Sequence, residues 1–348
     1  MIGPAGRVAY AVSQTARVSW FFAQYALAAR IGGPAVPPAR RPVRSSLPDT
    51  RGVVDELRRL MRRDLANIEA GYYRLPHDMA GPPGRALADA LRFFGDLPEV
   101  RRRRRTGAGA EVRQSLPPDA SGLPSYYLQN FHFQTDGYLS ERSARLYDHQ
   151  VEVLFGGGAD AMRRQALVPI WRHLGERGVK GRRLLDVGAG TGRFLTFVKD
   201  NYPRLDATAL DLSRSYLAEA RRNLAAWRGV RFLQAAAEAM PVADASQDVV
   251  TCIYLFHELP RRVRREAAAE MARVLRPGGL LVFADSIQPG DSPHLDGLLE
   301  LFPLGFHEPY YADYLRQDLG PVFGDAGLEP MGVDLAFMTK ILTFRKGV

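Results

Sequence analysis

The sequence of 348 residues is poor in the features on which several protein classes depend. Its single cysteine, Cys252, excludes an intramolecular disulfide framework and makes a cytoplasmic, reducing location the expectation. Seven histidines are scattered without metal-ligand spacing, so no bound metal is expected. No segment offers the roughly 20 predominantly apolar residues that a membrane-spanning helix needs. Disulfide-stapled, zinc-finger and membrane-spanning classes are therefore disfavoured.

Hydrophobic residues make up 46% of the chain and charged residues 24%, which is ordinary globular usage and excludes a wholly disordered, collagen-like or coiled-coil protein. The length exceeds that of one usual compact domain, so a catalytic-sized domain with an extension is expected. The net charge of +9 lies within residues 1–120, which hold 20 arginines and 11 acidic residues, whereas residues 121–348 are neutral. The sequence therefore predicts a basic, mainly helical extension on a neutral body.

Residues 8–31 form an apolar, helix-compatible stretch with clustered aromatic side chains. Gln14, Arg17 and Gln24 would lie at bilayer depth if this helix crossed a membrane, so it is not expected to span one. Two alternatives stay open. The helix lies on a partner or on a membrane surface, which would place the protein peripherally at the inner face, or it packs on the protein's own catalytic domain.

Residues 32–50 are rich in proline, glycine and arginine and are expected to form an irregular linker. Asp49 or Thr50 can cap a following helix, in which apolar residues recur at helical spacing as far as Ile68. A further short helix is expected over residues 85–94.

Five consecutive arginines at 101–105 could neutralise the phosphates of a nucleic acid. No helix-turn-helix, zinc-finger or RNP-type motif accompanies them, and the rest of the chain is neutral. A solvated or lipid-headgroup-facing loop is therefore the favoured interpretation, and no specific nucleic acid is expected as a partner.

The second half of the chain alternates short apolar strands with helical segments, the pattern of a parallel sheet covered by helices on both faces. The last two apolar pieces, 328–337 and 339–345, have no helix between them and are expected to pair as an antiparallel hairpin. The other expected strands lie near 183–188, 207–211, 230–235, 248–254 and 279–285, and the expected helices near 192–201, 213–227, 261–275 and 313–327.

The first of these strands runs into its helix through LLDVGAGTGRF. Gly188, Gly190 and Gly192 let the backbone turn tightly and approach a ligand with no side chain in the way. Arg193 breaks the dinucleotide-binding spacing G-x-G-x-x-G. Asp211, at the end of the next strand, is placed to accept hydrogen bonds from both hydroxyls of a ribose.

Together with AAAEAMPVADASQDVV, YLFHELP and VLRPGGLLVFAD, these segments resemble the successive motifs of class I S-adenosylmethionine-dependent methyltransferases, nearest to the ubiquinone/menaquinone biosynthesis branch. The resemblance covers about residues 140–348. It implies an α/β fold with a doubly wound, Rossmann-like sheet of seven strands, S-adenosyl-L-methionine as the cofactor, and methyl transfer as the activity.

Carried over by position, the resemblance implies that Asp186 and the three glycines hold the methionine end of the cofactor and that Asp211 holds the ribose. The family often has aspartate where this chain has Ala236, which passes contact with the adenine to the backbone near Ala237 and to Glu238. The other implied cofactor contacts are Leu212, against the adenine, with Tyr254 and the pre-strand Tyr147.

His257 follows the fourth strand, at the carboxyl edge of the sheet where ligands of open α/β folds bind. With an ordinary pKa of about 6.5 it suits a general base for an acceptor that must lose a proton. Alternatively, His257 and Glu258 orient the loop by hydrogen bonds. Both interpretations stay open.

Aromatic residues gather on either side of the cofactor-binding motifs. In similar methyltransferases the segment before the first strand and the insertion after the fifth form a lid and a largely dry acceptor pocket. An apolar lid of this kind favours a small hydrophobic acceptor, which could be aromatic, isoprenoid or lipid-like. The residues expected to line the pocket are Phe131, His132, Tyr138, Phe306, His307 and Tyr310.

Three parts are therefore expected: the extension (1–120), an aromatic-rich helical lid segment (121–181) and the cofactor-binding domain (182–348). Two alternatives to a small-molecule methyltransferase remain. One is a nucleic-acid methyltransferase recruited by the arginines at 101–105, and the other is a non-catalytic cofactor-binding scaffold. The sequence does not indicate the acceptor, the methylated atom or the oligomeric state.

Overall fold

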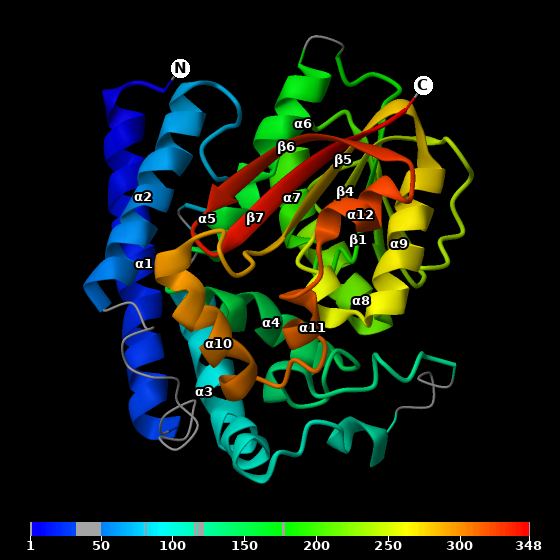
Figure 1. Ribbon diagram of the computed structural model, residues 1–348. Coiled ribbons are helices and arrows are strands. Elements are labelled where there is room, and N and C mark those ends of the chain that lie inside the picture. The colour runs from blue at the N-terminus through cyan, green and yellow to red at the C-terminus, as the bar shows by residue number, and fades with distance from the viewer. Residues whose placement is uncertain are drawn as a thin grey trace.

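The computed structural model describes residues 2–32, 50–79, 81, 83–114, 116, 122–175 and 178–347. Within them, seven strands form one sheet flanked by helices (Figure 1). The strands are β1 (Arg183–Val187), β2 (Asp206–Asp211), β3 (Val230–Gln234), β4 (Gln247–Ile253), β5 (Leu275–Ser286), β6 (Leu328–Ala336) and β7 (Thr339–Lys346). The α-helices are α1 (Pro4–Gly32), α2 (Thr50–Glu69), α3 (Pro83–Thr106), α4 (Glu141–Leu154), α5 (Ala159–Gln165), α6 (Leu167–Leu174), α7 (Arg193–Asn201), α8 (Arg214–Asn223), α9 (Arg261–Val274), α10 (Asp296–Gly305), α11 (Tyr311–Tyr314) and α12 (Leu319–Gly324).

The strand order is β3-β2-β1-β4-β5-β7-β6, in which β1 to β5 are parallel and β7 runs antiparallel to both β5 and β6. The doubly wound seven-stranded sheet and its antiparallel hairpin are thus confirmed. The order reverses between β1 and β4, and ligands of open α/β sheets bind at such a reversal, outside the carboxyl ends of the strands. The loops after Val187 and Ile253 therefore lie where a site is expected.

Helices cover both faces of the sheet because successive residues of a strand point to opposite sides. Leu185 and Val187 of β1 belong to a core shared with α9 and α12. Leu184 belongs to the opposite core, shared with α6, α7 and α8. Cys252 is buried in the first of these cores.

The helix expected over 313–327 is broken into α11 and α12, so that prediction is wrong in its extent. Asp318 begins α12 as a cap, since its side chain accepts a hydrogen bond from the backbone N–H of Gly320 at 3.0 Å. Pro321 follows in the first turn of the helix, where a backbone N–H would have no acceptor within the helix and proline is therefore tolerated. A capping residue inside the stretch therefore overrides its helical spacing.

The N-terminal helices pack against the rest of the chain. Figure 1 shows α1 and α2 side by side at one edge of the sheet, with α3, α4 and α10 below its carboxyl ends. Tyr10 and Phe21 of α1 are buried, and Tyr10 shares a core with Leu184 of β1. Residues 8–31 thus pack on the protein's own domain, and no helix in the described ranges is long and apolar enough to cross a bilayer. The expected linker, with Asp49, lies outside the described residues apart from its first and last positions.

The arginines at 101–105 end a long helix and do not form a loop. Because α3 continues through Pro98 to Thr106, the helix expected over 85–94 is confirmed but extends further, and the loop expected at 101–105 is wrong.

Two of these arginines hold the chain that follows α3. The buried Arg103 donates hydrogen bonds to the Glu111 carboxylate at 2.8 Å and to the Phe133 carbonyl at 3.1 Å. Arg102 pairs with the same carboxylate at 2.5 Å. The run is therefore partly a structural element that sets the position of residues 111–133.

Candidate active site

The loop between β1 and α7 is a tight glycine turn at the carboxyl edge of the sheet. Gly188, Gly190 and Gly192 all have positive φ, the left-handed region that glycine enters without strain. The N–H groups of Gly188 and Ala189 donate to the Leu210 carbonyl of β2, both at 2.9 Å. The turn is thereby fixed against the neighbouring strand, with its backbone exposed to the crevice.

Replacing Gly192 by alanine is expected to destabilise the protein more than replacing Gly190. A Cβ at Gly192 would lie 2.7 Å from Leu224 Cδ1 and 3.2 Å from Ala220 Cβ, whereas at Gly190 the nearest atom is Tyr216 Cδ1 at 3.9 Å. Overpacking costs ~1–3 kcal/mol, so urea denaturation should show a deficit of about that size for Gly192→Ala relative to Gly190→Ala. Equal stabilities of the two variants would contradict the steric argument.

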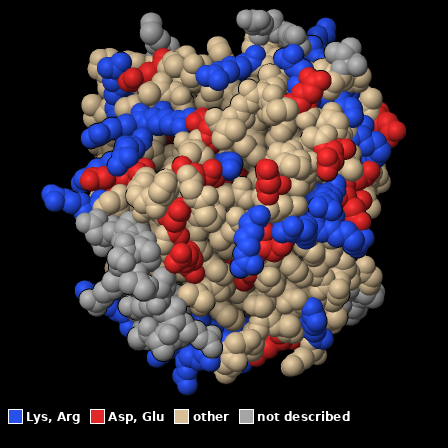
Figure 2. Space-filling model, in the orientation of Figure 1, with Lys and Arg blue, Asp and Glu red and all other residues tan. Residues whose placement is uncertain are grey.

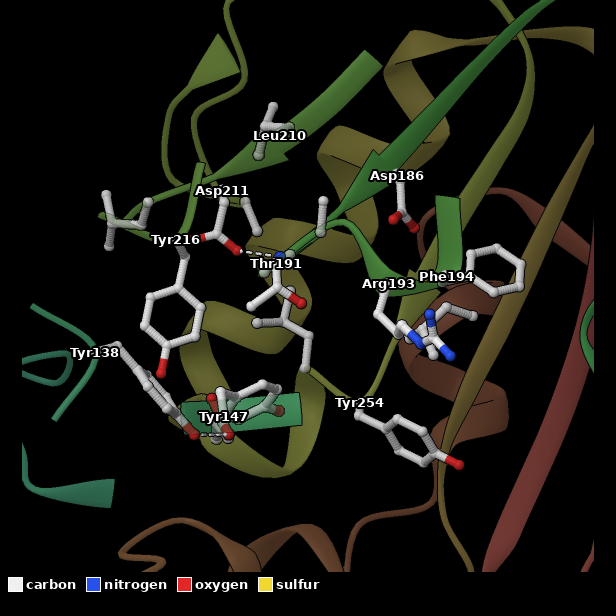
Figure 3. A pocket seen from close by; sticks show the side chains of 18 of the residues that line it. Tyr138, Tyr147, Asp186, Thr191, Arg193, Phe194, Leu210, Asp211, Tyr216 and Tyr254 are labelled. Carbon is white, nitrogen blue, oxygen red and sulfur yellow. Dashed lines mark hydrogen bonds between the residues drawn. The ribbon is translucent and has the colours of Figure 1, made fainter. Parts of the chain in front are cut away.

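Asp211, the last residue of β2, ties the turn to the crevice. Its Oδ2 accepts a hydrogen bond from the Gly190 N–H at 2.7 Å, and its Oδ1 accepts one from the Ser213 N–H at 2.7 Å (Figure 3). Burial raises the pKa of Asp211 to about 6, although these backbone donors oppose the shift. Because its surroundings disfavour its ionised form, this carboxylate is well placed to bind a ligand that supplies further hydrogen-bond donors.

Asp186, on β1, is the second buried carboxyl group beside the crevice. It accepts a hydrogen bond from Thr251 Oγ1 at 2.6 Å. Burial raises its pKa to about 7, and the charge of Asp211 adds to the shift against the hydrogen bond from Thr251. The two carboxyl groups at adjacent strand ends therefore make one face of the crevice strongly favourable for positively charged or hydrogen-bond-donating groups.

The first hollow is the space in front of these groups (Figure 3). Nine of the ten predicted cofactor residues line it: Asp186, Gly188, Gly190, Asp211, Leu212, Ala237, Glu238, Tyr254 and Tyr147. Gly192 does not, because it faces Leu224 and Ala220 at the start of α7. Tyr138, predicted for the acceptor pocket, lines this hollow instead, as do Asp148, Arg163, Arg193 and Tyr126, which the sequence did not single out.

The two ends of the first hollow carry different polar groups. At one end Tyr126 donates a hydrogen bond to Glu238 Oε1 at 2.5 Å, which leaves Oε2 buried without a hydrogen-bond partner among the described residues. At the other end Asp148 accepts a hydrogen bond from Thr191 at 2.9 Å, and the Arg163 guanidinium lies 6.0 Å from the centre of the Tyr254 ring. This arrangement would match a ligand that has a hydrogen-bond donor near Glu238 and, near Asp148 and Arg163, one positively and one negatively charged group.

Comparison with known proteins places the glycine turn and Asp211 within a recognised domain. Residues 184–279 match the family described as "Methyltransferase domain". The chain contains a class I methyltransferase domain. S-adenosyl-L-methionine is the cofactor that such a domain implies, and the orphan oxygen of Glu238 and the glycine turn fit it.

Similarity to individual methyltransferases is confined to part of the chain. A malonyl-[acyl-carrier protein] O-methyltransferase of Xylella fastidiosa is 37% identical over 34% of this chain and 39% of its own length. A demethylmenaquinone methyltransferase of Deinococcus radiodurans is 37% identical over 31% of this chain and 44% of its own. A solved S-adenosylmethionine-dependent methyltransferase of Aquifex aeolicus is 21% identical, covering 53% of this chain and 92% of its own, with a TM-score of 0.39. The chain thus spans less than half the length of these curated relatives.

His257 of the methyltransferase domain is held by Asp285, at the end of β5. Its Nδ1 lies 2.6 Å from Asp285 Oδ1, while Asp285 Oδ2 accepts hydrogen bonds from the Phe256 and His257 N–H groups at 2.8 and 3.3 Å. Burial alone would lower the pKa of His257, but Asp285 outweighs it and raises the pKa to about 9. The hydrogen bonds with Asp285 thus fix the imidazole in place, which favours the orienting interpretation over the general base.

The second hollow lies between the extension and the lid segment, with Phe306 at its end. It is mainly apolar, and Tyr147 lines both hollows. Its walls come from α1, α3, α4 and the end of α10. The lining residues are Tyr25, Ala28, Ala29, Phe93, Asp96, Leu97, Val100, Arg104, His132, Leu146, Tyr147, Gln150, Val151, Val153, Leu154 and Phe306.

The six residues predicted for an acceptor pocket are only partly brought together. His132 and Phe306 line the second hollow. Phe131 stacks on Tyr138 behind the wall of the first, with ring centres 5.0 Å apart. His307 contacts the Gln129 side chain at 3.0 Å, and Tyr310 donates a hydrogen bond to the Tyr126 carbonyl at 3.4 Å. The walls formed by α1 and α3 were missed, because nothing in the sequence of either helix indicates which distant segment it faces.

Proposed function

We propose that the protein transfers the methyl group of S-adenosylmethionine to a small lipophilic acceptor held in the second hollow. The observation that carries this proposal is the pair of hollows that share Tyr147, one with the glycine turn and strand-end carboxylates and the other mainly apolar. Methyl transfer needs alignment of acceptor, methyl carbon and sulfur and exclusion of water, and orientation alone supplies up to ~7–11 kcal/mol in ideal systems.

The cofactor is a sulfonium, so it arrives with its methyl group already activated. Asp211 is proposed to accept hydrogen bonds from the ribose hydroxyls, and the free oxygen of Glu238 from the adenine amino group. Arg163 suits the carboxylate of the methionine part, and Asp148 its ammonium group. Residues 182–348 then supply most of the cofactor site, while the extension and the lid segment supply most of the acceptor chamber.

Three observations support a lipophilic acceptor. Side chains from four helices give the second hollow a largely aliphatic and aromatic lining. The names of two relatives place their acceptors on an acyl-carrier protein and on demethylmenaquinone. The five-arginine run offers little to a nucleic acid, because Arg102 and Arg103 are engaged internally and basic and acidic side chains are intermixed on the face seen in Figure 2.

The decisive experiment joins cofactor binding to acceptor discovery. Calorimetry with S-adenosylhomocysteine should give one site per chain, and incubation with S-adenosylmethionine carrying a labelled methyl group should place label in a lipid extract of the source cells. Absence of any affinity for the cofactor product would overturn the function. Normal cofactor binding with label in no small molecule would favour the scaffold alternative.

We also propose that α1 touches a membrane surface, a position from which a lipid-borne acceptor is reached. Six large apolar side chains of α1 are exposed, namely Val8, Val12, Trp20, Tyr25, Leu27 and Ile31. The net basic charge of residues 1–120 suits anionic headgroups.

Charged substitutions on the exposed face of α1 test this contact. Deleting the helix would also remove Tyr10 from the core and Tyr25 from the second hollow, so the matched variant is V12E/W20E/I31E. We expect the wild-type protein to co-sediment with phosphatidylglycerol vesicles and the triple variant to remain largely in solution. If both stay in solution, the membrane contact is wrong.

A further inference from the structure

Glu308 lies between α10 and α11 and is 5% exposed, and neither oxygen of its carboxyl group has a hydrogen-bond partner among the described residues. Buried polar groups are almost always paired, and an unpaired buried carboxyl group costs several kcal/mol. The cost indicates that something not part of the chain completes the surroundings of Glu308.

Other metal-binding donors surround this carboxyl group. Ligand atoms of His257, Glu258 and Glu308 all lie within 4.8 Å of one another, with His257 Nε2 at 3.8 Å from Glu258 Oε1. On the other side, His132 Nδ1 lies 3.4 Å from Glu308 Oε1. One imidazole and two carboxyl groups thus converge on one point, and the His132 imidazole lies beside Glu308 at its edge.

A second layer of hydrogen bonds holds two of these groups in place. Asp285 engages Nδ1 of His257, so that Nε2 is the nitrogen turned toward Glu258. Tyr138 donates a hydrogen bond to Glu258 Oε1 at 2.5 Å. A carboxylate on the far nitrogen of a histidine and a hydrogen bond to a ligating carboxylate are the usual supports of metal ligands in proteins.

We propose that His257, Glu258 and Glu308 bind one divalent cation of the first transition series. Mixed imidazole and carboxylate donors suit manganese, iron, cobalt or zinc, whereas magnesium and calcium prefer oxygen donors throughout. The sequence predicted no metal because these three residues occur at positions without ligand spacing, and only the fold assembles them. The cation neutralises the two carboxylates and supplies the partner that Glu308 lacks.

The position of this site bears on the acceptor, and this consequence rests on the proposed function. Glu258 lines the first hollow and His132 lines the second, so the cation lies where the methyl donor and the acceptor meet. Three protein ligands leave room on the ion for an oxygen of the acceptor. The acceptor is therefore a molecule that presents an oxygen atom, such as a hydroxyl or a carboxylate, at one end of an apolar body.

Cobalt binding tests the site directly on the full-length protein. Metal-free protein titrated with Co²⁺ should bind one ion per chain and develop visible d–d absorption bands. The isosteric variants Glu308→Gln and His257→Gln should weaken binding by at least ~100-fold, more than the ~10–100-fold that loss of an outer support costs. His149→Gln is the matched control, a buried histidine that bonds Gln24 at 2.8 Å outside the cluster, and should bind Co²⁺ like the wild type.

A measurement without variants guards against misfolding of the substituted proteins. Crystals soaked in Zn²⁺ should show an anomalous peak at about 2.0–2.2 Å from ligand atoms of His257, Glu258 and Glu308. Stoichiometric Co²⁺ binding that survives both cluster substitutions, an anomalous peak elsewhere, or no binding at all would overturn the proposal. Calorimetry with S-adenosylhomocysteine on the same metal-free sample distinguishes the two proposals. If the protein binds S-adenosylhomocysteine but no metal, only the cation proposal fails. If it binds the metal but not S-adenosylhomocysteine, only the proposed methyltransferase function fails.

Discussion

Replacing Asp160 by asparagine is expected to lower the free energy of unfolding by about 3–5 kcal/mol, because it removes the counter-ion of buried Arg163 and one of the two carboxylates that pair with Arg17 and with Arg193. Asp160 is 2% exposed and begins α5. It accepts hydrogen bonds from Arg17 of α1 at 2.6 Å, from Arg163 at 3.0 Å and from Arg193 Nε, beside the glycine turn, at 3.0 Å. One carboxylate therefore joins the extension, the lid segment and the cofactor turn.

Urea denaturation of Asp160→Asn and wild-type protein at pH 7 measures this loss. Asp89→Asn is the matched control, since Asp89 forms exposed pairs with Arg85 and Arg92, and such pairs contribute ~0–1 kcal/mol. If Asp160→Asn loses no more free energy of unfolding than the control variant does, the arginines find other partners.

The pH dependence of this deficit has a definite sign. Burial alone would raise the pKa of Asp160, but the charges of Arg193 and Arg17 hold it well below the ordinary value. A group with a lowered pKa in the folded state stabilises above its unfolded pKa of about 3.9 and loses that contribution as the pH falls. The stability gap between wild type and Asp160→Asn should therefore be constant from pH 7 to about 5 and shrink below about 4. A gap that widens in acid would contradict this assignment.

Replacing Asp211 by asparagine is expected to weaken S-adenosylhomocysteine binding by roughly 100-fold while the stability of the free protein falls little or rises. Two charge-assisted hydrogen bonds to ribose hydroxyls contribute about 3 kcal/mol or more, which sets the loss of affinity. Burial raises the pKa of Asp211 to about 6, so at pH 7 the unliganded protein carries an ionised group that is destabilised by its surroundings. Asparagine removes that cost, although it can accept only one of the hydrogen bonds from Gly190 and Ser213.

Calorimetry and thermal denaturation on the same samples separate the two effects of Asp211→Asn. Asp206→Asn, at the exposed opposite end of β2, is the matched control and should change neither. Unchanged affinity in Asp211→Asn would mean that the ribose is held elsewhere. A stability loss of several kcal/mol would mean that the carboxylate supports the glycine turn more than it costs.

Local pattern was sufficient to predict the sheet and much of the lining of the first hollow. Gly190 and Asp211 lie beside strands whose apolar runs are short and well bounded, so their position at the carboxyl edge follows from the chain order. Glu308 and His132 could not be predicted in the same way, because their neighbours are set by the packing of loops about 50 to 180 residues apart along the chain. The same holds for Asp160, whose three arginines lie on three different elements.

Helix ends were predictable only where no tertiary contact overrides the local capping or helix-breaking residue. Asp318 is a cap inside an otherwise helical pattern, and the pattern gave the wrong extent. The helix expected over 85–94 was too short, because α3 continues through Pro98 to the arginines at 101–105, of which Arg103 pairs with Glu111. Tertiary contacts decided both cases.

The attachment of α1 to Asp160 has a consequence for synthesis of the chain. Arg17 leaves the ribosome 143 residues before its partner, and at ~5–20 residues per second this is a delay of ~7–30 s. During this interval the helix has neither its counter-ion nor the hydrophobic surface that buries Tyr10 and Phe21. The nascent chain therefore presents an apolar, positively charged helix to the cell before the fold that accommodates it exists, and chaperones or membrane surfaces meet the protein first through this segment.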